Sequence, residues 1–325
     1  MFEQADTGLH TWAHAMHTRT ERFDDVHRHA SAITGWQQTY DQLSHGAPST
    51  VLQHMDGQGF QIFHETLDKR VVQQGVAPIG RLCLAMPMSR SQPVLFQGAC
   101  ATADSVSLLQ GGQEFSVQAA QGMELLAMTV ASDRFEQLTE RAFIDSRLRA
   151  LGRSVNLDVA QNTLAAIRQR LLALVGAAQA NPRFPENVAQ DTVLQSMLDL
   201  LEQGHEQPCA RTGNYRVSAY LVRQSQALAM ADSETPITVL DICEQLRVSR
   251  RTLQRSFVSV TGMRPVDYLR SVRLNAVRRR LQATRASDCT VAHIASDFGF
   301  SHLGHFGVAY KALFGEQPSR TARVR

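Results

Sequence analysis

The chain has 325 residues, of which 43% are hydrophobic, and its 33 Lys and Arg against 30 Asp and Glu give a formal net charge of +3. This length predicts two or three domains of roughly 150 residues each, with ample buried core. No apolar run reaches the roughly 18 residues of a membrane helix, and residues 1–23 lack the apolar core of a secretory signal. The five cysteines have no CxxC spacing, which argues against a disulfide framework or a zinc site. We therefore expect a cytoplasmic protein that has no membrane partner and whose cysteines are reduced.

Charge is distributed unevenly along the chain. Residues 214–325 contain 17 Lys and Arg against 8 Asp and Glu, a balance of +9, and the remaining residues contain 16 against 22, a balance of −6. A basic C-terminal unit on an acidic body fits double-stranded DNA as a partner of that unit. Uneven charge on an ordinary solvated surface is the alternative.

Residues 1–131 are predicted to form a β-rich sensor domain. Residues 1–30 are expected to be a mobile lead-in, and short β-prone runs separated by turn residues follow. Those runs are 49–52, 59–63, 81–86, 94–96, 106–109, 114–117 and 125–130. Asp56-Gly57 and Gly111-Gly112 are hairpin-turn signals. Strands without intervening helices favour a small barrel or sandwich, of a cupin-like kind, that encloses one small ligand.

Residues 132–213 are predicted to form a helical dimerisation region and linker. Ser132 is a candidate N-cap for a helix ending near Phe143, and helices are expected near 159–178 and 187–203. These helices have apolar faces for packing on the β domain or on a second subunit. Residues 204–213 are the best linker candidate, and a helix is expected over 215–231.

A pattern of apolar, glycine and proline residues occurs twice in the last 90 or so residues. The two sets are Ile242, Val248, Leu253, Phe257, Gly262, Pro265 and Ile294, Phe300, Phe306, Tyr310, Gly315, Pro318. Each set is typical of a short helix, a tight turn and a second helix, which is the layout of a helix-turn-helix unit. Residues 214–325 are therefore predicted to be an all-α domain with two such units, and the chain as a whole is an α+β protein.

In the first unit, Thr238 is expected to cap a helix whose inward face is Leu240, Ile242, Cys243 and Leu246. Ser249 is expected to cap the next helix, in which Leu253 and Phe257 face the core. Arg251, Gln254 and Arg255 then share the exposed face, where Arg can bind guanine and Gln can bind adenine in the major groove.

A long helix over 266–281 is expected to join the units. Its arginines, Arg270, Arg273, Arg278, Arg279 and Arg280, are assigned either to phosphate contacts or to solvent. In the second unit, Gly304, Gly307 and Val308 occupy the positions of Arg251, Gln254 and Arg255. Since these side chains cannot hydrogen-bond to bases, the first unit is predicted to make most of the base-specific contacts with DNA. The glycines suggest close approach of the backbone to DNA or to the protein core. The candidate DNA-binding residues are Ser249, Arg250, Arg251, Thr252, Gln254, Arg255, Arg270, Arg273, Ser301, His302, Gly304, His305 and Lys311.

The candidates for an effector pocket are large apolar residues of the β region. They are Trp36, Tyr40, Phe60, Phe63, Met86, Met88 and Phe96, each of which is equally suited to an ordinary core. His27-Arg28-His29 matches half of a cupin metal site but has no downstream Glu and His at fitting spacing, so no metal is assigned. No phosphate loop, nucleophile elbow or metalloprotease motif occurs, so no catalytic residue is assigned and the protein is predicted not to be an enzyme.

The C-terminal stretch resembles the AraC/XylS family of bacterial transcription regulators. The matching segments are Val248-Ser249-Arg250-Arg251-Thr252-Leu253-Gln254-Arg255, Gly262-x-x-Pro265-x-x-Tyr268-Leu269-Arg270, Arg273-Leu274 and Ile294-Ala295 through Gly315-x-x-Pro318. The family often has a basic residue where Val308 stands, which again places base reading in the first unit. The resemblance implies an activator that acts on RNA polymerase.

The segments Ile33-Thr34-Gly35-Trp36-Gln37-Gln38-Thr39-Tyr40, Thr238-Val239-Leu240-Asp241 and Arg273-Leu274-Asn275-Ala276 resemble the regulators of ethanolamine-utilisation operons. This resemblance implies ethanolamine and adenosylcobalamin as effectors. The sequence therefore favours a ligand-responsive, homodimeric DNA-binding activator. The alternatives are an architectural DNA-binding protein whose N-terminal domain only mediates assembly, and an enzyme with a DNA-binding tail.

Overall fold

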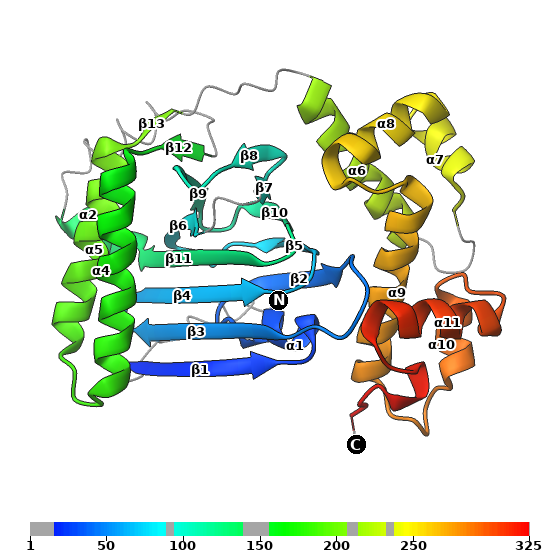
Figure 1. The fold of residues 1–325 in the computed structure, drawn as a ribbon, viewed down its shortest axis with the longest axis horizontal. Helices are drawn as coiled ribbons and strands as arrows, with labels where there is room; N and C mark the ends of the chain where they lie inside the picture. Colours follow the sequence, from blue (N-terminus) through cyan, green and yellow to red (C-terminus); the bar gives the residue numbers. More distant parts are fainter. Residues whose placement is uncertain (1–15, 89–93, 139–155, 207–213, 232–236, 325) are drawn as a thin grey trace, which may run out of the picture.

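The structure is a computed structural model, and it describes residues 16–88, 94–138, 156–206, 214–231 and 237–324. A β-rich part carries two helices on one side and meets a helical C-terminal part on the other (Figure 1). None of the helices within these ranges is long and apolar enough to cross a membrane.

The β-rich part consists of two antiparallel sheets. The larger has the order β1 (His17–Phe23), β3 (Thr50–Gly57), β4 (Phe60–Leu67), β11 (Met123–Ala131), β6 (Arg81–Pro87), β9 (Ser105–Gln110), β12 (Asn156–Asp158), β13 (His205–Glu206). The smaller has the order β2 (Gln37–Gln42), β5 (Val71–Val76), β10 (Glu114–Ala119), β7 (Val94–Phe96), β8 (Ala99–Ala101). One apolar cluster, which includes Tyr40 and Val71 of the smaller sheet and Leu67 and Leu125 of the larger, joins the two sheets as a sandwich.

The strand prediction is confirmed for all seven runs, but the hairpin signals are not. Asp56 and Gly57 lie within β3, and the turn of the β3–β4 hairpin is Gln58-Gly59. Gly111-Gly112 does form a turn, but that turn joins β9 of the larger sheet to β10 of the smaller one rather than closing a hairpin. Gly59 and Gly112 adopt positive φ, 79° in each case, in the turns that join β3 to β4 and β9 to β10.

The mobile lead-in was wrong for residues 17–32, which form β1 and α1 (Val26–Ala32). β1 escaped prediction because it is a polar edge strand that pairs only with β3, so it has no apolar alternation.

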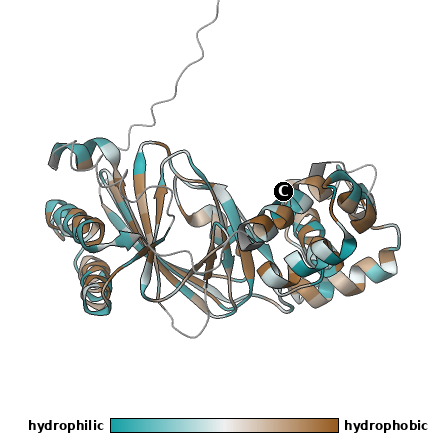
Figure 2. Ribbon diagram, turned by 90° about the horizontal axis from the view of Figure 1, so that it is seen from above, coloured by the Kyte–Doolittle hydropathy of each residue, from teal (hydrophilic) through white to brown (hydrophobic). Residues whose placement is uncertain are grey.

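Two long helices cover the outer face of the larger sheet. They are α4 (Gln161–Ala180) and α5 (Glu186–Gln203), and their apolar stripes join one buried cluster with the sheet. Leu164, Ile167 and Leu171 of α4 are at most 1% exposed, as the spacing predicts for a helix packed on one face. Figure 2 shows hydrophilic as well as hydrophobic residues along these helices. Of the two predicted packing partners, the structure uses the β domain. The first helix, α2 (Ser132–Leu138), is described only in part, because residues 139–155 lie outside the described residues.

The helical C-terminal part contains the two predicted helix-turn-helix units. They are α7 (Val239–Gln245) with α8 (Arg250–Thr261), and α10 (Val291–Asp297) with α11 (Leu303–Phe314). α6 (Asn214–Ala231) precedes them, α9 (Pro265–Ala283) joins them, and a short 3-10 turn, η1 (Pro318–Arg320), follows (Figure 1). α8 and α11 both end at a glycine in the left-handed region, Gly262 at φ 66° and Gly315 at φ 78°, which is where the repeat places its glycines.

Candidate nucleic-acid interface and enclosed pocket

The turn of the first unit is fixed by two predicted caps. The hydroxyl of Thr238 accepts from the backbone N–H of Asp241, and the Asp241 carboxylate accepts from the backbone N–H of Thr238, so the two form a capping box. The hydroxyl of Ser249 accepts from the backbone N–H of Thr252 at 3.1 Å. Ser249 and Thr252 therefore begin α8, which sets the direction in which its exposed face points.

The outer face of α8 is basic and free of packing. Leu253 and Phe257 are fully buried, while Arg250, Arg251, Gln254 and Arg255 are exposed. Residues 251, 254 and 255 share one side of the helix, since side chains three and four positions apart are neighbours. One detail of the prediction was wrong: Leu240 is 58% exposed rather than inward, because the short helix α7 buries only Ile242 and Cys243.

The arginines of the joining helix α9 divide into two groups: two are exposed, as one of the two alternatives predicted, and three contact other parts of the protein. Arg270 and Arg280 are exposed, but Arg273 donates to the carbonyl of Ile237 at 2.7 Å. Arg278 and Arg279 turn toward the β-rich part. Arg278 is buried and pairs with Asp25, whereas Arg279 pairs with Asp41 and keeps 29% of its side chain exposed.

The second unit presents little hydrogen-bonding capacity on its recognition helix. Ser301, His302, His305 and Lys311 are exposed, and Val308 is 73% exposed. A Cβ added at Gly304 or Gly307 would meet no described atom within 4 Å. Packing within the protein therefore does not require glycine at these positions, which removes one of the two explanations that the sequence left open.

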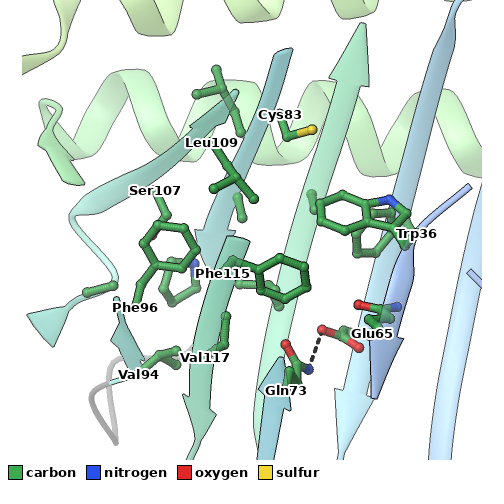
Figure 3. A pocket seen from close by; sticks show the side chains of 18 of the residues that line it. Trp36, Glu65, Gln73, Cys83, Val94, Phe96, Ser107, Leu109, Phe115 and Val117 are labelled. Atoms are coloured by element: carbon green, nitrogen blue, oxygen red, sulfur yellow. Dashed lines mark hydrogen bonds between the residues drawn. The ribbon is translucent and has the colours of Figure 1, made fainter. Parts of the chain in front are cut away.

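A cavity of about 50 Å³ lies between the two sheets. Its lining comes from both sheets and is mainly apolar, with the aromatic rings of Trp36, Tyr40, Phe63, Phe96 and Phe115. Figure 3 shows Phe115 between Phe96 on one side and Trp36 on the other. A largely apolar cavity with a few convergent polar groups is typical of a small-molecule site.

The polar groups of the cavity meet at Glu65, which is fully buried on β4. Gln73 donates to one carboxylate oxygen at 2.9 Å, and the hydroxyl of Tyr40 donates to the other at 2.9 Å. The imidazole of His29, from α1, lies 3.2 Å from that second oxygen. Burial, reinforced by the negative charge of Glu65, raises the pKa of Tyr40 well above its usual value, so the phenol remains a donor.

Four of the predicted effector residues line this cavity: Trp36, Tyr40, Phe63 and Phe96. Phe60, Met86 and Met88 do not, because they belong to or pack against the cluster under α4 and α5 on the other side of the larger sheet. Sequence reasoning missed Glu65, Gln73 and Phe115. The period of two along a strand offered a signal, since Glu65 lies between Phe63 and Leu67 on one face of β4.

The elements that carry this polar cluster also hold the DNA-binding domain. Asp25, the N-cap of α1, accepts from Nε of Arg278 at 2.7 Å and from Gln282 at 2.6 Å, and both donors lie on α9. Asp41, on β2, pairs with Arg279. Both carboxylates are at most 4% exposed, so the two ion pairs lie inside the domain interface.

Asn275 of α9 binds β2 through backbone groups. Its side-chain oxygen accepts from the backbone N–H of Gln42 and its side-chain nitrogen donates to the carbonyl of Gln42, both at 2.9 Å. The side-chain amide of Gln42 donates to the backbone carbonyl of Leu313 in α11 at 2.6 Å. One strand therefore contacts both the joining helix and the second recognition helix.

Buried charge sets the protonation of this interface. Burial, together with repulsion from Arg279, lowers the pKa of His27 to about 3, and attraction to Asp25 offsets only part of this shift. Burial also works to raise the pKa of Asp25, but His27 and Arg278 outweigh it and the net shift is downward. The interface at neutral pH thus contains a neutral imidazole beside a charged carboxylate–guanidinium pair.

Comparison with known proteins gives this geometry a family. Residues 242–323 match a family of helix-turn-helix domains. The chain is 36% identical over 89 residues to the XylDLEGF operon transcriptional activator 1 of Pseudomonas putida, covering 27% of each protein. It is 30% identical over 152 residues to the transcriptional activator RhaS of Pectobacterium atrosepticum, covering 47% of this chain and 52% of that one.

A solved structure from Rhodopseudomonas palustris CGA009, described as a probable AraC family transcriptional regulator, is 33% identical with a TM-score of 0.30. The match covers 32% of this chain and 99% of that one. The chain therefore spans about a quarter to a half of the length of the two activators. Residues 242–323 accordingly belong to a family of helix-turn-helix domains, and the chain is similar to AraC-like transcription regulators.

Proposed function

We propose that the protein is a ligand-responsive, sequence-specific transcription activator that binds double-stranded DNA through its C-terminal domain. In this proposal α8 enters one major groove and reads bases with Arg251, Gln254 and Arg255. α11 enters the next groove face, about one helical turn away. Because Gly304, Gly307 and Val308 offer no side-chain hydrogen bond, α11 contributes contacts to phosphate, DNA shape and apolar groups such as the thymine methyl.

One observation supports the ligand response above all others. His29 and Tyr40 contact the carboxylate of the cavity, and the elements that bear them, α1 and β2, carry the interface carboxylates Asp25 and Asp41. A ligand that repositions the cavity cluster would therefore act on the elements that hold α9. By linkage, it changes DNA binding only as far as it binds the two arrangements of α9 with different affinity.

Ethanolamine and adenosylcobalamin are the first effectors to test. Ethanolamine is small enough for the cavity between the sheets. Adenosylcobalamin is larger than the drug-sized ligands that cavities of about 300–1,000 Å³ hold, so its binding would require a second site. We further propose that the protein acts as a homodimer and contacts RNA polymerase, as the name of activator given to its relatives suggests.

The test is salt-dependent binding of the purified protein to its own upstream DNA, with and without each compound. A specific footprint whose affinity falls with salt, and whose strength or extent changes with a ligand, is expected. Footprints that no metabolite alters would favour the architectural alternative, in which the N-terminal domain only mediates assembly. The absence of any specific footprint would contradict the proposal as a whole.

A further inference from the structure

Acidic and basic side chains are few in the cavity between the sheets. Among the described residues that line it, Glu65 is the only one with a carboxyl group. No Lys or Arg is in that lining, and burial raises the pKa of the Cys83 thiol to about 12, so Cys83 is neutral. A carboxylate or phosphate ligand would enter without a counter-charge and would face Glu65, which is unfavourable in a desolvated site.

The carboxylate of Glu65 retains capacity for one more donor. An ionised carboxylate offers about four acceptor positions. Gln73 occupies one position on the first oxygen, and Tyr40 and His29 approach the second. The remaining position lies on the oxygen that Gln73 contacts. Figure 3 shows the hydrogen bond between Gln73 and Glu65, with Glu65 on the same side of the view as Trp36.

Aromatic rings share the cavity lining with Glu65. Trp36 is edge-on to Phe63, with ring centroids 5.8 Å apart, and edge-on to Phe115, with centroids 5.4 Å apart. The indole N–H of Trp36 donates to Gln61 at 3.1 Å, so it is not available to a ligand. The faces of such rings carry negative potential and attract a cation, and rings grouped around a carboxylate recognise ammonium groups.

We propose that this cavity binds an organic ammonium ion. The apolar body of the ligand lies among Trp36, Phe96 and Phe115, and its ammonium group donates to Glu65. This inference rests on the proposed function, because it names the chemical class of the ligand that the sensor domain takes. It separates that ligand from carboxylate effectors, which the lining disfavours, and from neutral alcohols, which bring no positive charge to the carboxylate.

Three probes of one shape test the charge. Benzylamine, benzyl alcohol and benzoate have the same ring and differ in a cationic, neutral or anionic head at neutral pH. Calorimetry and thermal shift on the full chain are expected to show that benzylamine binds about tenfold or more tighter than benzyl alcohol, and that benzoate binds weakest. Benzoate binding as tightly as benzylamine, or benzylamine giving no heat and no stabilisation, would overturn the proposal.

Glu65→Gln keeps the shape of the side chain and removes its charge. In this variant the preference for benzylamine over benzyl alcohol is expected to disappear. Glu124→Gln is the matched control, since Glu124 lies on the neighbouring strand β11 with its side chain 47% exposed and outside the cavity lining, and it should keep the preference. A preference retained in Glu65→Gln would overturn the proposal. If that variant does not fold, Phe115→Leu, which removes one ring, is expected to weaken benzylamine more than benzyl alcohol, and an equal loss for both probes would count against the proposal.

The same samples separate this inference from the proposed function. Benzylamine that binds in a Glu65-dependent way without changing the DNA footprint supports the ligand class and contradicts the ligand response. A footprint that responds to a carboxylate supports the ligand response and overturns the ligand class.

Discussion

Tyr40 and Asp41 are neighbours on β2, yet their side chains serve different domains. The hydroxyl of Tyr40 donates to Glu65 in the cavity, and the carboxylate of Asp41 pairs with Arg279 on α9. Successive side chains of a strand point to opposite faces, so adjacent residues contact the sensor cavity and the DNA-binding domain. Asp25 and His29 repeat this arrangement at the start of α1. Asp25 pairs with Arg278 on α9, and His29, one helical turn further on, contacts Glu65 in the cavity. Two elements thus connect the proposed effector to the helix that spaces the two recognition helices.

Arg278→Gln is expected to destabilise the protein by about 3–5 kcal/mol, because it leaves the carboxylate of Asp25 buried without its partner. Arg278 is 7% exposed, also donates to Glu316 at 2.7 Å, and stacks over the ring of Phe314 with 4.7 Å to its centroid. Urea unfolding gives the free energy. Arg280→Gln, on the exposed side of the same helix, is the control and should change stability by less than about 0.5 kcal/mol.

A double-mutant cycle with Asp25→Asn isolates the pair itself. The two substitutions together should cost clearly less than the sum of their separate effects, since the second removes the unpaired charge that the first creates. If the two losses in the free energy of unfolding simply add, Arg278 and Asp25 are not coupled. The ion pair would then not stabilise the contact between α1 and α9.

Arg251→Ala and Arg255→Ala are each expected to weaken specific DNA binding by about 1–3 kcal/mol. Each should also relax base preference at the base pair that the lost side chain contacts. Both side chains are exposed on α8 beside the buried anchor Leu253. Titration of operator variants by fluorescence anisotropy measures affinity and preference together. Arg28→Ala removes the same charge from the N-terminal domain, where the side chain is 70% exposed, and should leave both quantities unchanged.

The sequence predicted the helical domain in more detail than the sensor domain. The caps Thr238 and Ser249 and the glycines that end α8 and α11 are local signals, each decided within a few residues. The strands β2, β5 and β8 were missed as well as β1, β12 and β13. The last three are short or polar and depend on pairing with strands distant in sequence.

The candidate sites followed the same division. Exposed recognition-helix residues could be read from helical periodicity. The roles of Glu65, Arg278 and Arg279 could not be predicted in this way, because each depends on a partner more than 7 residues away. A run of charged residues also does not reveal which side of a helix a second domain covers. Arg278 and Arg279 were accordingly assigned to phosphate or solvent, and the structure places them in the domain interface.

Gly304→Ala is expected to have opposite effects on stability and on DNA affinity. Alanine stabilises a helix by roughly 1 kcal/mol relative to glycine, and the added Cβ meets no described atom within 4 Å. If the glycine serves close approach to DNA, affinity falls for all operator variants alike and base preference is retained. Thermal unfolding and anisotropy give the two quantities. Gly176→Ala in α4 is a matched control, because its Cβ also meets nothing within 4 Å, and it should stabilise the protein without affecting DNA binding. An unchanged affinity in Gly304→Ala would contradict close approach at this position.

His27 is expected to make the stability of the protein depend on pH between about 6.5 and 3. Its pKa falls from 6.5 in the unfolded chain to about 3 in the folded protein, because burial disfavours the charged imidazole and Arg279 repels it. In this window the unfolded chain binds more protons than the folded protein, so stability is present above pH 6.5 and is lost as the pH decreases. The loss at pH 5 is on the order of 2 kcal/mol.

Urea unfolding of the wild type and of His27→Gln at pH 7.5 and pH 5 measures this contribution. The variant cannot take up the proton, so its stability should fall less between the two pH values. Asp25, beside His27, also loses stabilisation in acid, but its pKa is lowered from 3.8, so its contribution begins to fail only below the pH of this comparison. A pH dependence that is equal in the two proteins would show that His27 is protonated in the folded state, and hence that the interface between α1 and α9 is open to water.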